Sequence, residues 1–99
     1  MEHSNIIWAT RITEEENNYL QATYYEMVGA RNLAVHAVVS IPEAYERLQK
    51  DYIKALTIHE TLLEELRVKY VPKEYRTNRY RMNVAFDDCE LMIEDANAR

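Results

Sequence analysis

The stretch from Pro42 to Tyr70 constrains the fold most, because it reads as one long helix with an apolar seam along its whole length. Its seam residues recur every seven positions, with a second row three positions later: Tyr45, Tyr52, His59 and Leu66, then Leu48, Ala55 and Leu62. An apolar face of this length must be covered by another part of the structure. The 99 residues allow a single domain, residues 1–99, with one modest core.

The preceding segment predicts a partner helix over about residues 13–39. Thr13 and Glu16 have the spacing of a capping box, in which each side chain bonds the backbone amide of the other. A row of apolar residues follows at every seventh position: Leu20, Met27, Ala34 and Ile41. Small residues flank this row: Thr23, Ala30 and Ala37. A second cap with proline in the first turn, at residues 40–43, starts the next helix at about residue 41. Such a short connection predicts an antiparallel αα-hairpin.

Both ends of the chain show strand patterns. Residues 5–12 are rich in β-branched and aromatic side chains, which predicts a short strand. Residues 79–96 fit two structures, because their apolar side chains alternate as in a β-hairpin turning at Asp87-Asp88 and also recur at helical spacing. We favour the β-hairpin, since the N-terminal strand needs a partner and acids at Glu94 and Asp95 would oppose a helix C-terminus.

The predicted fold class is therefore α+β and mainly helical. It consists of a long antiparallel αα-hairpin and a small antiparallel sheet, built from the N-terminal strand and the C-terminal β-hairpin. The second helix should end near residue 70, because Pro72 disfavours helical geometry at the residue before it. Residues 71–78 then form a basic loop. The alternative is an all-α three-helix bundle.

Composition limits the classes of function. A net charge of −5 argues against general binding to nucleic acid, which needs a cationic surface. The N-terminus has no signal-peptide pattern, and no apolar run approaches membrane-spanning length. Cys89 is the only cysteine, so an intrachain disulfide is excluded and a reducing compartment is favoured. We therefore expect a cytoplasmic protein that binds neither membrane nor nucleic acid.

His59 and Cys89 are the residues most capable of chemistry, and neither has the sequence companions of a catalytic site. His59 lacks the second histidine four positions on that a zincin helix requires, and Cys89 has no CxxC partner. We expect no catalytic residue, no metal and no cofactor. The interpretation is that His59 is a partly buried helix residue, and a helical-bundle metal or acid/base enzyme using His59 is the alternative.

The most binding-like feature lies between Lys69 and Arg81. Five basic residues here accompany a single acid, Glu74, which gives a local charge of +4, and tyrosines are interleaved among them. Tyrosine and arginine dominate protein interfaces, and positive charge favours an acidic protein or peptide. The predicted partner-binding residues are Tyr70, Lys73, Tyr75, Arg76, Arg79, Tyr80 and Arg81.

Four stretches carry a resemblance to a known group of proteins: residues 10–16 (TRITEEE), 45–51 (YERLQKD), 69–70 (KY) and 84–93 (VAFDDCELMI). Their layout resembles the small accessory proteins of CXXX-repeat peptide modification systems, which accompany radical-SAM maturases of ribosomally made peptides. The resemblance implies a non-enzymatic adaptor that engages a maturase or its precursor peptide. The alternative is a structural homodimer, whose exposed seam pairs with itself into a four-helix bundle.

Overall fold

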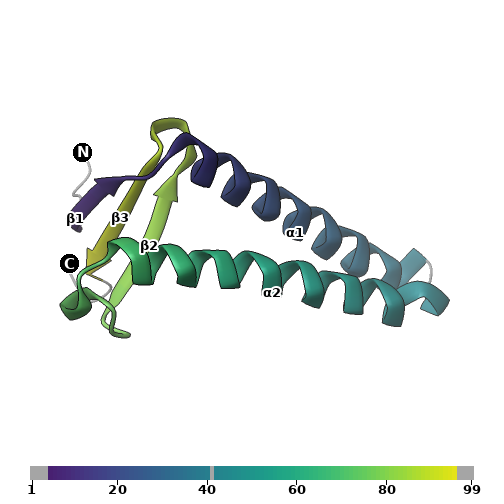
Figure 1. Ribbon diagram of the computed structural model, residues 1–99. Helices are drawn as coiled ribbons and strands as arrows, with labels where there is room; N and C mark the ends of the chain where they lie inside the picture. Colours follow the sequence, from purple (N-terminus) through teal and green to yellow (C-terminus); the bar gives the residue numbers. More distant parts are fainter. Residues whose placement is uncertain (1–4, 41, 96–99) are drawn as a thin grey trace. The chain divides into compact units, whose positions relative to one another are not determined.

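The computed structural model describes residues 5–40 and 42–95 and confirms the predicted α+β, mainly helical fold. The elements follow in the order β1 (Ile6–Arg11), α1 (Glu14–Ser40), the 3-10 helix η1 (Pro42–Ala44), α2 (Tyr45–Tyr70), the 3-10 helix η2 (Lys73–Tyr75), β2 (Tyr80–Ala85), the 3-10 helix η3 (Phe86–Asp88) and β3 (Glu90–Asp95) (Figure 1). The three-helix alternative is wrong, because the tail forms two strands.

Element boundaries differ from the predicted ones by a few residues. The second helix opens with the 3-10 turn η1 rather than as α-helix, and the predicted basic loop 71–78 contains the 3-10 helix η2. Position 41, the predicted start of the second helix, and position 96, the predicted end of the β-hairpin, lie outside the described residues.

The described residues group into two compact units. The first combines the residues up to Asn18 with those from Glu64 onward, so it holds the sheet, the start of α1 and the end of α2. The second, Tyr19–Leu63, is the helical hairpin made of the remaining parts of α1 and α2.

In the first unit, β3 is the central strand of a three-stranded antiparallel sheet with the order β1-β3-β2 (Figure 1). The pairing of β2 with β3 runs regularly from Tyr80 opposite Asp95 to Ala85 opposite Glu90. Apolar and polar residues alternate along these strands, so one face collects the apolar side chains. Leu91 and Ile93 of β3 are 0% and 1% exposed, and they form the centre of this unit's core.

The turn between β2 and β3 is tied to the segment that enters α1. The backbone amide of Ile12 donates to the carbonyl of Cys89 at 2.9 Å, and Asn17 Nδ2 donates to the carbonyl of Phe86 at 2.9 Å. Cys89 itself lies in the left-handed region with φ of 51°. The turn therefore falls at the predicted Asp87-Asp88 position, and its final residue adopts a conformation that is costly for a side chain with a Cβ atom.

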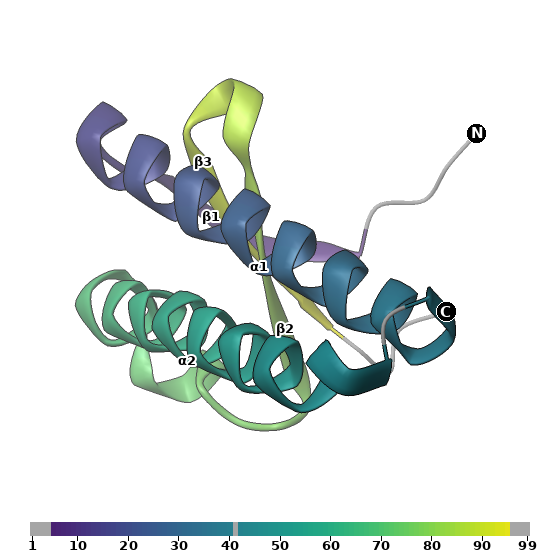
Figure 2. The same cartoon turned by 90° about the vertical axis from the view of Figure 1, so that its right-hand side faces the viewer.

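In the second unit, α1 and α2 are joined by contacts between side chains. Leu20, Ala34 and Ala37 of α1 are buried, and His59 of α2 is buried on the facing side. Figures 1 and 2 show the two helices running side by side. The small residues of α1 predict close approach of the two helix backbones. The structure differs, because the helices keep a wider separation and meet through side chains, as Thr23 Oγ1 and His59 Nδ1 do at 2.9 Å.

The left-handed conformation at Cys89 generates a stability prediction. Replacement of Cys89 by glycine or asparagine, both of which tolerate positive φ, should leave the free energy of unfolding unchanged or raise it by up to about 1 kcal/mol. Replacement by valine, which is β-branched, should lower it by about 1–2 kcal/mol. Urea denaturation measures these changes. If the asparagine variant were as unstable as the valine variant, packing of the thiol rather than backbone conformation would govern this turn.

Candidate functional site

All seven predicted partner-binding residues lie in the sheet-containing unit, but they divide into supporting and accessible groups. Arg76 belongs to the first group. Its Nε donates to the carbonyl of Val71 at 2.9 Å and its Nη2 donates to that of Val68 at 3.1 Å. These carbonyls lie at the C-terminal end of α2, where a helix leaves acceptors unpaired and favours positive charge. Arg76 therefore caps α2.

Tyr75, Arg79 and Tyr80 come together beside the start of β2. The rings of Tyr75 and Tyr80 meet edge to face with centroids 5.2 Å apart, and the Arg79 guanidinium carbon lies 5.6 Å from the centre of the Tyr80 ring. Arg79 also pairs with Asp95 at 3.0 Å, and Arg81 pairs across the strands with Glu94 at 3.5 Å. With Lys73, which is exposed, these residues form the surface that we call the tyrosine-arginine surface: Lys73, Tyr75, Arg79, Tyr80 and Arg81.

Tyr70 lies apart from the tyrosine-arginine surface and belongs to a cluster around the carboxylate of Glu16. Its hydroxyl donates to Glu16 Oε1 at 2.6 Å, and Lys69 Nζ donates to Oε2 at 2.5 Å. The capping box is present as predicted, since the Thr13 amide donates to Glu16 Oε1 at 2.9 Å and the Glu16 amide donates to Thr13 Oγ1 at 3.0 Å. The Glu16 cluster, made of Thr13, Glu16, Lys69 and Tyr70, thus joins the first turn of α1 to the last turn of α2.

The groups of the Glu16 cluster keep their protonation states at neutral pH, with Glu16 ionised and Lys69 and Tyr70 protonated. Partial burial raises the pKa of Glu16, but hydrogen bonds from Lys69, Tyr70 and Thr13 outweigh this and lower the pKa to about 2. The hydrogen bond to Glu16 raises the pKa of Lys69 and likewise that of Tyr70. A group that moves protons in catalysis needs a pKa near the working pH, and all three groups are shifted away from it. The arrangement is suited to holding the two helix ends together.

Acid should remove the contribution of the Glu16 carboxylate to stability. Because the folded-state pKa of about 2 lies below the ordinary 4.5, this contribution is complete above pH 4.5 and is lost as the pH falls toward 2. Glu16→Gln should lower the free energy of unfolding at pH 7 by about 1–2 kcal/mol and flatten its fall in acid. Glu15→Gln, an exposed acid in the same turn, is the matched control for urea denaturation at pH 7 and pH 3. Identical behaviour of the two variants would contradict this role.

His59 lies buried in the hairpin unit, where its Nδ1 is 2.9 Å from Thr23 Oγ1. The Thr23 hydroxyl uses its one hydrogen to donate to the carbonyl of Leu20 at 2.9 Å. Its oxygen is therefore the acceptor toward His59, and Nδ1 carries the hydrogen that it donates. Burial lowers the pKa of His59, and the negative charge of Glu60 opposes this shift only in part. The lowered pKa favours a neutral imidazole. The described residues contain no group of three or more histidine, cysteine, aspartate or glutamate side chains that could hold a metal ion.

The buried imidazole generates a pH prediction for the hairpin. Because burial lowers the pKa of His59, the unfolded chain takes up its proton first, and stability should fall as the pH drops below 6.5. His59→Leu should remove that step, which thermal unfolding at pH 7.5 and pH 5.5 can measure. Thr23→Val should cost about 1 kcal/mol at pH 7.5, because it leaves Nδ1–H without its acceptor. An unchanged step in the His59→Leu protein would assign the pH dependence to other groups.

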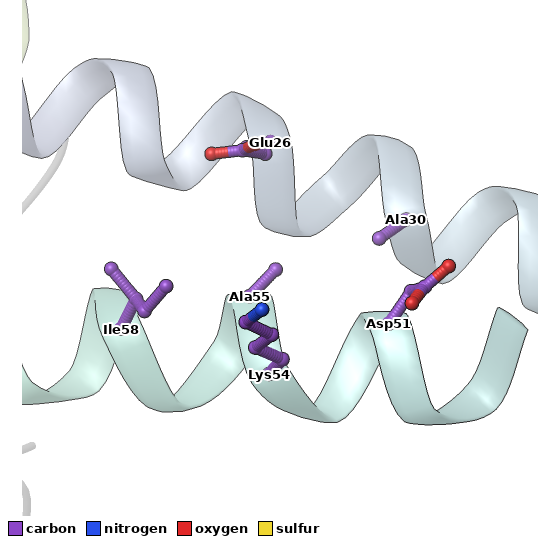
Figure 3. Close-up of a pocket in the computed structure, with 6 residues that line it drawn as sticks. All are labelled: Glu26, Ala30, Asp51, Lys54, Ala55 and Ile58. Atoms are coloured by element: carbon purple, nitrogen blue, oxygen red, sulfur yellow. The ribbon is translucent and has the colours of Figure 1, made fainter. Parts of the chain in front are cut away.

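A groove of about 350 Å³ opens between α1 and α2 within the hairpin unit. Figure 3 shows its alanines between the helices and its charged groups around them. The lining residues are Glu26, Ala30, Asp51, Lys54, Ala55 and Ile58. Two carboxylates and one ammonium group line the groove, and its lining residues include no imidazole, thiol or hydroxyl.

Sequence reasoning missed the grouping of Glu16 with Lys69 and Tyr70. The three residues stand in two of the stretches that carry the resemblance, and this was the available signal. No protein-family model, no curated protein and no solved structure matches this chain. None of the helices in the described ranges is both long and apolar enough to cross a membrane.

Proposed function

We propose that this chain is a non-enzymatic adaptor protein of the cytoplasm, an accessory factor in ribosomal peptide modification that engages a maturase or its precursor peptide. The observation that supports this best is the tyrosine-arginine surface. Its ring pair and guanidinium contact gather at one place the residue types that anchor protein interfaces. The partner is a protein or peptide with acidic groups, because the stretch from Lys69 to Arg81, which includes this surface, carries a local charge of +4 in an acidic chain.

The ion pairs at this surface leave its arginines accessible to a partner. The side chains of Arg79 and Arg81 are 59% and 60% exposed while paired with Asp95 and Glu94. The carboxylates of these pairs are more covered, with the side chains of Asp95 and Glu94 16% and 25% exposed, so an acidic partner would bind the solvent side of the guanidinium groups rather than replace them. Tyr70 and Arg76 act indirectly, because they fix the end of α2, and the residues of the tyrosine-arginine surface follow that end in the chain.

The resemblance to accessory proteins of CXXX-repeat systems supplies the biological setting of the proposal. It rests on residues 10–16, 45–51, 69–70 and 84–93, of which all but residues 45–51 lie in the sheet-containing unit. Within that unit, hydrogen bonds join the capping segment to Lys69 and Tyr70, and Ile12 to Cys89 of the β2–β3 turn. A gene for a radical-SAM enzyme beside one for a cysteine-rich repeat peptide, next to the gene for this chain, would support the assignment.

The test is co-expression of the tagged chain with a radical-SAM maturase and CXXX-repeat precursor of one such system, followed by affinity capture. The wild-type chain should retain one of the two proteins. Lys73→Glu with Arg81→Gln should reduce capture at least tenfold. Lys50→Glu with Arg47→Gln makes the same charge change on exposed positions of α2 and should capture normally. No capture by the wild type, or equal capture by both variants, would contradict the proposal.

A homodimer formed through the hairpin unit is the second candidate, because large apolar side chains of this unit are exposed. Leu33 is 60% exposed, Val35 64% and Ile53 51%. Soluble monomers seldom leave extensive apolar surface uncovered. Light scattering separates this candidate from the first: a monomer at micromolar concentration that still captures its partner excludes the dimer and leaves the adaptor function standing.

A further inference from the structure

The two edges of the sheet differ in how well they are protected against another strand. Along β1, the pairing with β3 is interrupted by a register shift between Ile6 and Trp8. Along β2, all six residues from Tyr80 to Ala85 pair with β3 without a shift. Bulges protect sheet edges from further pairing, whereas a regular edge is a template for it. Within the described residues, β2 pairs with β3 alone, so its other side is the regular edge.

The hydrogen bonds of β3 show which groups of β2 face this edge. The Asp95 amide donates to the carbonyl of Asn5 at 3.2 Å, on the β1 side, and therefore points away from Tyr80, its opposite residue on β2. Directly opposite residues in an antiparallel pair either bond each other or both point outward, and the two arrangements alternate along the strand. Met82 and Val84, which lie two and four residues after Tyr80, consequently present their N–H and C=O groups to the open edge.

The side chains along β2 define what an added strand should carry. Tyr80, Met82 and Val84 lie on the core face but are only half-buried, in contrast to Leu91 and Ile93 at the centre of the same face. An added strand would cover this apolar row. On the other face, the Arg81 side chain is 60% exposed and offers its positive charge to a neighbour.

We propose that an extended acidic segment of the partner adds to β2 as a fourth strand. Its apolar side chains lie beside Met82 and Val84, and its alternate acidic side chains lie beside Arg81. Main-chain hydrogen bonds supply affinity, and the alternating side chains supply selectivity. The inference rests on the proposed function, since it gives the binding mode at the β2 end of the tyrosine-arginine surface. Pairing with a second copy is disfavoured, because it would bring two sets of Arg79 and Arg81 together.

The probe is a synthetic eight-residue peptide of alternating valine and glutamate, titrated into the isotope-labelled full chain. Binding should slow hydrogen exchange at the Met82 and Val84 amides at least tenfold in NMR spectra. The Arg81 and Asn83 amides already face β3 and should change little. The same peptide with N-methyl groups on alternate residues keeps its side chains but loses its donors, and it should bind at least tenfold more weakly. Replacing its glutamates by lysines should weaken binding as well.

Two variants at Met82 test the same binding mode with the captured protein partner in place of the synthetic peptide. Met82→Pro removes the outward amide without removing a bond to β3, which is tolerated at a sheet edge, and Met82→Ala removes the side chain but keeps the amide. Met82→Pro should reduce capture at least tenfold more than Met82→Ala.

Three results would overturn the inference. In the first, the Met82 and Val84 amides remain unprotected while the resonances of Tyr75 and Tyr80 shift, so that the partner docks on side chains and the proposed function survives. In the second, protection depends on chain concentration without peptide, which identifies a second copy as the occupant. In the third, the wild-type chain binds neither the peptide nor the maturase or precursor, and the proposed function then fails together with the inference.

Discussion

The carboxylate of Glu16 is the interaction on which the sheet-containing unit most depends. It accepts hydrogen bonds from the backbone amide of Thr13, the residue before α1, and from Lys69 and Tyr70, fifty-three and fifty-four residues further along. These bonds fix the end of α2, and Arg76 then caps that end. The strand β2 starts a few residues later. The Glu16 cluster therefore fixes the end of the helix from which the chain continues to the tyrosine-arginine surface and to the open strand edge.

Local patterns predicted the elements well, because each signal lies within a few residues. The capping box at Thr13 and Glu16 and the alternation along residues 80–95 are examples, and both were found. The partners of long side chains were harder to predict. Lys69 has Glu65 one helical turn before it, yet it pairs with Glu16, and Arg76 belongs to a basic cluster, yet it caps a helix. Such choices depend on tertiary proximity, which spacing in the sequence does not encode.

The hairpin-or-helix ambiguity of the tail shows the same limit. Its apolar residues recur at the spacing of a strand and also at the spacing of a helix. The strand form is favoured by β1, because the backbone groups of β1 need a partner strand for their hydrogen bonds. Once β3 takes the centre, β2 becomes an edge, and its sequence begins with the predicted residues Tyr80 and Arg81. The fold thus converts a basic stretch of the sequence into a strand edge flanked by aromatic and guanidinium groups, a combination suited to an extended acidic peptide.

The most direct measurement of the central claim is a double-mutant cycle between Glu16→Gln and Tyr70→Phe, read by urea denaturation at pH 7. If the carboxylate holds the two helix ends together, the two substitutions should be non-additive by about 1 kcal/mol or more, because each already breaks the shared bond. Additive losses would show that the contact contributes nothing to the free energy of unfolding, and would contradict the account of how the end of α2 is fixed.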